Sequence, residues 1–160
     1  MPLRLLLTSL LSLALLGSVT ASASAATKIN FQPSGAAVPS GYLVDSGLTY
    51  GNRGNGQTYG WNTSTTSYTR ERNVASDQRK DTLITFEYAS SLVWEIAVPN
   101  GTYDVTLVAG DPQYFDSTHK INLEGSLFIN KAVSSSDPFA EQTGSVTVSD
   151  GKLRVRAFSS

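Results

Sequence analysis

The chain of 160 residues contains no cysteine, one histidine and one methionine, and charged residues make up only 16% of it. Without cysteine there can be no disulfide, no thiolate metal site and no cysteine nucleophile. The G-x-S-x-G elbow, the H-E-x-x-H pair, the P-loop and the D-x-[DN]-x-[DN]-G calcium loop are also missing. These absences exclude several enzyme classes and an EF-hand site, and they leave stability to a hydrophobic core, to a hard metal ion, or to both.

A long apolar run occurs only at the N-terminus. Arg4 precedes an apolar stretch over residues 5–16, and small residues follow it up to Ala23-Ser24-Ala25, which has the A-x-A form of a cleavage site. The stretch is about a dozen residues long, whereas a membrane span needs ~20. The sequence therefore predicts a cleaved signal peptide over residues 1–25. It also predicts a single domain over residues 26–160, secreted to the extracellular space or the periplasm.

The charge of this expected mature domain is close to balanced. Among charged residues the leader contains only Arg4, so 11 basic and 13 acidic residues remain. Such a surface has no basic patch of the kind that attracts nucleic acid or anionic membranes. We therefore expect no nucleic-acid partner and no membrane span.

Period-two alternation of apolar residues runs through residues 26–160, and no helical stripe of useful length interrupts it. Turn signals at Asn100-Gly101, Asp150-Gly151 and Glu124-Gly125 predict three hairpins. The hairpins join 92–98 to 103–109, 146–148 to 153–157, and 121–123 to 127–129. With strands at Ile29–Phe31 and Ile84–Phe86, the total is about eight strands. The expected fold is an all-β, antiparallel jelly-roll β-sandwich.

Residues 46–81 break this rhythm, because they are rich in Gly, Asn, Ser and Thr and show little alternation. The segment also holds several aromatic and arginine side chains, including Tyr59, Trp61 and Arg72. Disordered linkers are poor in aromatics, so we expect an ordered but irregular loop.

Three stretches resemble the malectin and malectin-like domains of the galactose-binding-like β-sandwich group. They are Lys28-Ile29-Asn30-Phe31, Tyr59-Gly60-Trp61, and the run from Trp94 through Pro99-Asn100-Gly101 to Gly110-Asp111-Pro112. The resemblance covers nearly all of residues 28–158. It implies a jelly-roll lectin or carbohydrate-binding module of the kind that accompanies polysaccharide-degrading enzymes.

The resemblance also implies where a ligand would bind. Malectin holds glucose-containing oligosaccharides with loop aromatics and an aspartate, and its adjacent tyrosine and phenylalanine correspond to Tyr114-Phe115 here. Related domains run on through one more strand after the position of residues 152–158, so this sandwich looks one C-terminal strand short. Two explanations stay open: the chain is a fragment of a longer parent protein with further domains, or its N-terminal strand takes that place.

The candidate ligand-binding residues are the aromatic and polar side chains expected in loops, namely Tyr114, Phe115, Asp111, Asp116, Tyr59, Trp61 and His119. Aromatic faces suit the apolar face of a pyranose, and carboxylates suit its hydroxyls. Tyr59 and Trp61 are equally consistent with plugging the open end of the sandwich. Trp94 and Tyr103 lie on a regular strand face and are expected in the core.

The polar segment from Asp111 to His119 allows other interpretations. Its two carboxylates could hold calcium, or they could cap turns. Asp116 and His119 have the D-x-x-H spacing of an esterase acid–base pair, but the Gly-Asp-Ser nucleophile block is missing. No catalytic residue is therefore predicted, and His119 is expected to be a ligand contact or a surface residue.

The preferred hypothesis is a secreted, non-catalytic, lectin-like domain that binds a polysaccharide or oligosaccharide. The alternative is an extracellular structural or adhesive module that binds protein at the cell surface, because sandwiches serve many functions.

Overall fold

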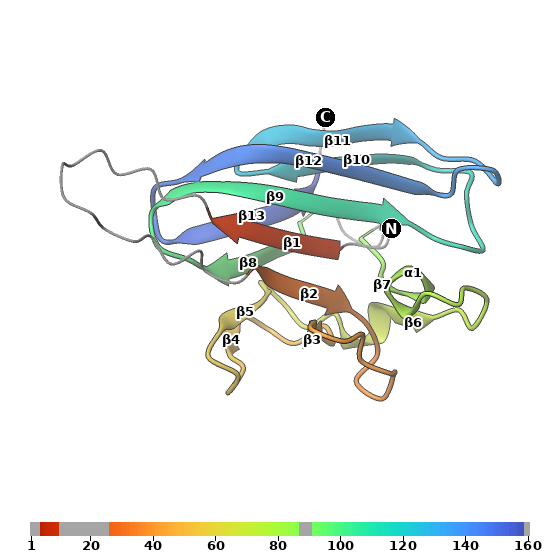
Figure 1. Cartoon of the computed structure of the whole chain (residues 1–160), viewed down its shortest axis with the longest axis horizontal. Coiled ribbons are helices and arrows are strands. Elements are labelled where there is room, and N and C mark those ends of the chain that lie inside the picture. The colour runs from red at the N-terminus through yellow and green to blue at the C-terminus, as the bar shows by residue number, and fades with distance from the viewer. Residues whose placement is uncertain (1–3, 10–25, 87–90, 159–160) are drawn as a thin grey trace.

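The fold is an all-β sandwich, seen here in a computed structural model that describes residues 4–9, 26–86 and 91–158 (Figure 1). The first sheet has the strand order β12 (Phe139–Val148), β9 (Gly101–Gly110), β1 (Arg4–Ser9), β2 (Thr27–Phe31) and β3 (Leu43–Asp45). The second has the order β11 (Ser126–Ala132), β10 (Thr118–Leu123), β13 (Lys152–Ala157), β8 (Val93–Ala97), β5 (Thr58–Trp61) and β4 (Gly51–Asn52). The all-β sandwich expected from the alternation is confirmed, with more strands than the approximately eight predicted.

Strand pairing is antiparallel throughout these two sheets except between β2 and β3, which run parallel. A small third sheet pairs β6 (Thr69–Glu71) with β7 (Thr82–Ile84). Two short helices, η1 (Thr66–Tyr68) and α1 (Gln78–Asp81), flank it. Within the described residues, no helix is long and apolar enough to cross a membrane.

Two of the three predicted hairpins are wrong. β8 and β9 flank the Asn100-Gly101 turn but belong to different sheets, and the same holds for β12 and β13 around Asp150-Gly151. Each turn is therefore an arch that carries the chain from one sheet to the other. The arches are tied together, since Gly151 N donates to Asn100 Oδ1 at 2.7 Å and Val98 N donates to the Gly151 carbonyl at 3.1 Å.

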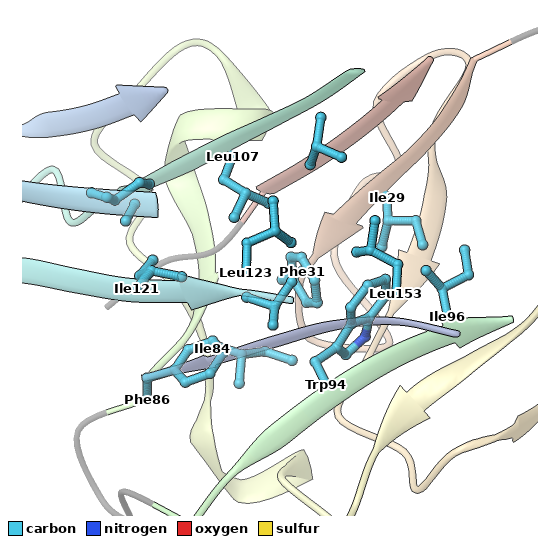
Figure 2. Packing of buried hydrophobic residues seen from close by; sticks show 14 of the residues in the cluster. Ile29, Phe31, Ile84, Phe86, Trp94, Ile96, Leu107, Ile121, Leu123 and Leu153 are labelled. Carbon is cyan, nitrogen blue, oxygen red and sulfur yellow. The ribbon is translucent and has the colours of Figure 1, made fainter. Parts of the chain in front are cut away.

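The alternation was misleading because an arch and a hairpin bury the same residues. Trp94 and Ile96 face the core from one sheet, and Leu107 faces it from the other (Figure 2). Val105 is buried on the same strand as Leu107. Two strands packed face to face thus show the same period of two as two strands paired side by side. The third predicted hairpin is confirmed: β10 and β11 pair across Glu124 (φ 48°) and Gly125 (φ 82°), the positive φ values of a type I′ turn.

The core is aromatic around β2, β5 and β8. Phe31 meets Trp94 edge to face with ring centroids 5.5 Å apart, and Trp61 in the same manner at 6.0 Å. One buried carboxylate lies among these rings: Asp45 accepts a hydrogen bond from Trp61 Nε1 at 3.0 Å and from Trp94 Nε1 at 2.7 Å. Because Asp45 ends β3 in the first sheet, these bonds join the two sheets. Trp94 and Tyr103 are buried, as predicted.

The segment 46–81 is ordered, as expected, but it is not a single irregular loop. It contains β4, β5, η1, β6 and α1. Its alternation is weak because these elements are only two to four residues long. Strands this short show too few alternating positions to be recognised from a pattern.

The segment Arg4–Ser9 forms β1 in the middle of the first sheet, antiparallel to both β2 and β9. The sequence assigned these residues to a signal peptide and predicted no strand there. The expected cleavage site at Ala23-Ser24-Ala25 lies outside the described residues, so cleavage stays a prediction.

Candidate functional site

The β9–β10 loop, residues 111–117, lies at one end of the sandwich beside the small third sheet. In Figure 1 the end of β9 lies on the same side of the molecule as β6, β7 and α1. The junction is an ion pair between Asp111, directly after β9, and Arg72, directly after β6. Arg72 Nε donates to both carboxylate oxygens of Asp111 at 3.1 Å, and Nη2 donates to Oδ2. A bidentate, charge-assisted contact of this kind fixes the orientation of both groups.

Tyr114 is the exposed aromatic of this loop, with 61% of its surface accessible. The guanidinium carbon of Arg72 lies 4.8 Å from the centre of its ring, a cation–π contact. Arg72 therefore supports the tyrosine on one face while Asp111 holds Arg72 in place. The result is an aromatic surface in solvent, which we call the Tyr114 platform and define as Tyr114, Arg72 and Asp111.

Phe115 has the opposite role in the same loop. It is half-buried and packs against the hydrophobic core. A second anchor comes from Asp111, whose Oδ1 accepts the backbone N–H of Gln113 at 2.9 Å. The structure thus separates the two adjacent aromatics: Phe115 anchors the loop, and Tyr114 is presented to solvent.

A second buried carboxylate holds the backbone that follows Arg72. Asp81, at the end of α1, accepts the backbone N–H groups of Asn73, Val74 and Ala75 at 2.7–2.8 Å. Burial alone would raise the pKa of Asp81, but these backbone donors outweigh burial and lower it. The chain just after Arg72 is therefore tied down by a residue that the predicted site did not include.

Tyr59 and Trp61 are not loop residues, and this expectation was wrong. Both lie in β5, where Tyr59 is 1% and Trp61 0% exposed. The Tyr59 hydroxyl donates to the Val44 carbonyl at 2.7 Å, and the Trp61 indole donates to Asp45. Because neither ring has an accessible face, neither can stack on a ligand in this structure.

His119 is also not at the surface. It lies in β10, opposite Lys131 of β11, and is 2% exposed. Asp116, three residues earlier, is exposed on the β9–β10 loop. Of the seven predicted ligand residues, the structure therefore leaves Tyr114 and Asp116 accessible, with Asp111 buried as the support of the platform.

No metal centre is evident in the part of the chain that the structure describes. Histidine, aspartate and glutamate side chains do not gather there in groups of three or more. The carboxylate of Asp111 is paired with Arg72, so this loop does not present the set of oxygen ligands that calcium needs.

A second polar cluster lies on the other sheet. Glu95 of β8 accepts from Lys152 Nζ at 2.9 Å and from Arg154 Nε at 2.7 Å, both on β13. Burial would raise the pKa of Glu95, but Lys152 and Arg154 lower it. Lys152 also lies 4.2 Å from the centre of the Tyr50 ring. The charges of this cluster satisfy one another, which makes it a natural comparison for the Tyr114 platform.

Sequence reasoning missed Arg72 as a site residue. Arg72 and Asp111 are 39 positions apart, and no spacing rule joins them. The available signal was indirect: an arginine-rich segment of unknown structure, and an aspartate at the end of a strand.

No protein-family model and no curated protein matches the sequence. Among solved structures, the chain is similar to protein YxiM from Bacillus subtilis, with 20% sequence identity and a TM-score of 0.55 over 83% of this chain. The chain spans 40% of the length of that protein. At this level of identity the likeness concerns the fold alone.

Proposed function

We propose that the chain is a non-catalytic, lectin-like domain that binds a polysaccharide or oligosaccharide at the Tyr114 platform. One observation carries this proposal: an aromatic ring 61% exposed is supported on one face by a guanidinium that a buried carboxylate holds in place. Because most of the Tyr114 ring lies in solvent, core packing does not account for it. Aromatic rings present a large contact area with few rotatable bonds, so binding them costs little conformational entropy.

The polar groups around the ring suit sugar hydroxyls. In the described residues, Nη1 of Arg72 has no hydrogen-bond acceptor, so its two N–H groups are available as donors. The exposed carboxylate of Asp116 on the same loop supplies acceptors. Hydrogen-bond donors against an aromatic ring, with a carboxylate two residues further along the same loop, suit an uncharged, hydroxyl-rich ligand.

The test is retention of the full chain on soluble plant and bacterial polysaccharides in affinity gel electrophoresis, with and without a chelator. Tyr114→Ala should weaken retention by the loss of one stacking contact, on the order of 1–2 kcal/mol, or about 5- to 30-fold in affinity. Because Tyr114 is exposed and loses only its cation–π contact with Arg72, this variant should stay folded, with a free energy of unfolding within about 1 kcal/mol of the unmodified chain.

The matched control is Tyr50→Ala, which removes the tyrosine of another tyrosine–cation pair, the one with Lys152. It should leave retention unchanged. Equal retention by Tyr114→Ala and the unmodified chain would exclude the platform as the binding site. Retention lost only in Tyr50→Ala would move the site to the second sheet, and no retention on any polysaccharide would favour a protein-binding module.

A further inference from the structure

The position of β1 has a consequence for the rest of the sheet. β1 separates β2 from β9, pairing through four register positions with the first and six with the second. Among the described strands, β2 pairs otherwise only with β3, and β9 only with β12. Without β1 the first sheet would divide into two pairs of strands. Because strands in a sheet are ~4.8 Å apart, a slot about 10 Å wide would lie between them.

Such a slot would be lined by core residues on one side. Ile29 of β2 and Val105 and Leu107 of β9 are all 0% exposed with β1 in place. Both neighbouring strands would also present unpaired backbone N–H and C=O groups along the slot. An unpaired strand edge of this length is a template for pairing with another strand.

The register of β1 with β2 and β9 specifies which kind of strand fits into the slot. Leu5 lies opposite Ile29 on one side and Leu107 on the other, and Leu7 lies opposite Thr27 and Val105. Leu6, between them, lies opposite Lys28 and Thr106, which are only partly buried. The strand that fits therefore has apolar residues at two alternate positions and runs antiparallel to both neighbours.

We propose that the slot between β2 and β9 is a strand-acceptor site, which takes an extended peptide segment of a partner protein once the leader has been removed. The partner strand has apolar residues in the positions of Leu5 and Leu7. This inference rests on the predicted cleavage of residues 1–25 and is independent of carbohydrate binding at the Tyr114 platform. The six-residue β1 occupies the site in the uncleaved chain and shows the pairing that the partner strand reproduces.

The experiment uses the full chain with a specific protease site inserted between residues 10 and 25. After cutting, β1 is held without a covalent link and can exchange with a fluorescein-labelled peptide of residues 3–10. Fluorescence anisotropy should show saturable, one-to-one uptake by the cut chain, and uptake at least tenfold weaker by the uncut chain. Equal uptake by the two forms, or none by a cut chain that stays folded, would overturn the proposal.

Two peptide variants test the register. A peptide with Leu5→Asp should bind at least about tenfold more weakly, because its carboxylate must enter a position between Ile29 and Leu107. A peptide with Leu6→Asp should bind within about threefold of the original, since Lys28 and Thr106 flank that position. Equal binding of the two variants would contradict an ordered acceptor site.

Two further outcomes are decisive. If the cut chain forms a stable dimer that takes up no peptide, the occupant is a second copy and not a partner strand. If the cut chain unfolds, the same two substitutions are compared in the uncut chain by thermal unfolding. There Leu5→Asp should lower the Tm clearly more than Leu6→Asp, and equal Tm values would overturn the proposal.

Discussion

The carboxylate of Asp45 accepts a hydrogen bond from the indole Nε1 of Trp94 at 2.7 Å, across the interface between the two sheets. Its other oxygen accepts from Trp61 Nε1 at 3.0 Å and from Gly47 N at 2.8 Å. Burial raises the pKa of Asp45, and the bonds from Trp94, Gly47 and Trp61 oppose that rise. A costly buried charge is thus kept because it satisfies the polar ends of two core tryptophans.

Asp45→Asn should destabilise the fold by about 1–3 kcal/mol at neutral pH. An asparagine offers one oxygen in place of two, so its amide N–H₂ faces an indole or backbone donor that then has no acceptor. The measurement is equilibrium unfolding in urea, followed by tryptophan fluorescence. Because Trp61 and Trp94 are the two tryptophans of the chain, the emission of the folded state should also change.

Glu141→Gln is the control for this substitution, since Glu141 is an exposed acid on β12. Its effect on the free energy of unfolding should be within about 0.5 kcal/mol. An Asp45→Asn variant as stable as Glu141→Gln would mean that the two indoles do not depend on both carboxylate oxygens.

The stability contribution of Asp81 should disappear in acid. Its folded-state pKa is lowered from the usual aspartate value by the N–H groups of Asn73, Val74 and Ala75. Between the unfolded pKa, about 3.9, and the lower folded pKa, the unfolded state binds more protons, so stability falls as the pH falls. The stability difference between the unmodified chain and Asp81→Asn should therefore be largest above about pH 5 and shrink toward pH 2.

The stability contribution of Asp45 is expected to change with pH in the opposite direction. Its folded-state pKa is raised, so its protonation accompanies folding and favours the folded state as the pH falls. As the pH falls toward about 4, the stability difference between the unmodified chain and Asp45→Asn should therefore grow, whereas the difference for Asp81→Asn shrinks. Parallel pH profiles for the two variants would contradict the buried environments assigned to these carboxylates.

The sequence predicted the fold class and much of the core, and it failed on connectivity. Alternation at Trp94, Ile96, Val105 and Leu107 identified core residues correctly, because burial alone sets that period. It could not show that these residues face one another from two sheets, since arches and hairpins share the same pattern. It also gave no reason to expect a strand at Arg4–Ser9, because the three consecutive leucines there show no period-two alternation and match a leader.

The candidate site was predictable only in part. Tyr114 was a candidate because the resemblance to malectin-like domains points to the adjacent aromatics Tyr114 and Phe115, in a segment expected to be a loop. Tyr59 and Trp61 were misplaced because β5 is four residues long and lies in a segment rich in glycine and polar residues. Arg72 was missed because its partner, Asp111, reaches it only through the tertiary fold.

Gly60→Ala should cost more than about 3 kcal/mol, because it combines backbone strain with a steric clash. Gly60 lies in β5 with φ 136°, and a Cβ there would lie 2.6 Å from the Leu48 carbonyl oxygen and 2.9 Å from that of Thr49. Gly56→Ala is the control, because Gly56 has φ 85° but no atom within 4 Å of a new Cβ. It should cost only the backbone term, about 1–2 kcal/mol. Urea unfolding of both variants checks this, and equal losses would argue against the close packing of β5.

The ion pair that supports the Tyr114 platform should contribute measurably to stability. The Arg72 and Asp111 side chains are 17% and 8% exposed, so their bidentate contact is largely shielded from solvent. A double-mutant cycle with Arg72→Met and Asp111→Asn should give a coupling energy of about 1.5–3 kcal/mol in urea unfolding. The coupling should persist at high salt, because a buried pair is weakly screened.

The matched comparison is the exposed pair of Lys131 and Asp137, whose side chains are 41% and 61% accessible. The cycle with Lys131→Met and Asp137→Asn should give less than about 1 kcal/mol and should decrease further with salt. Equal coupling energies for the two cycles would show that Arg72 and Asp111 interact no more strongly than a surface pair. In that case the Tyr114 ring would have no rigid support, and the physical basis of the proposed carbohydrate site would be lost.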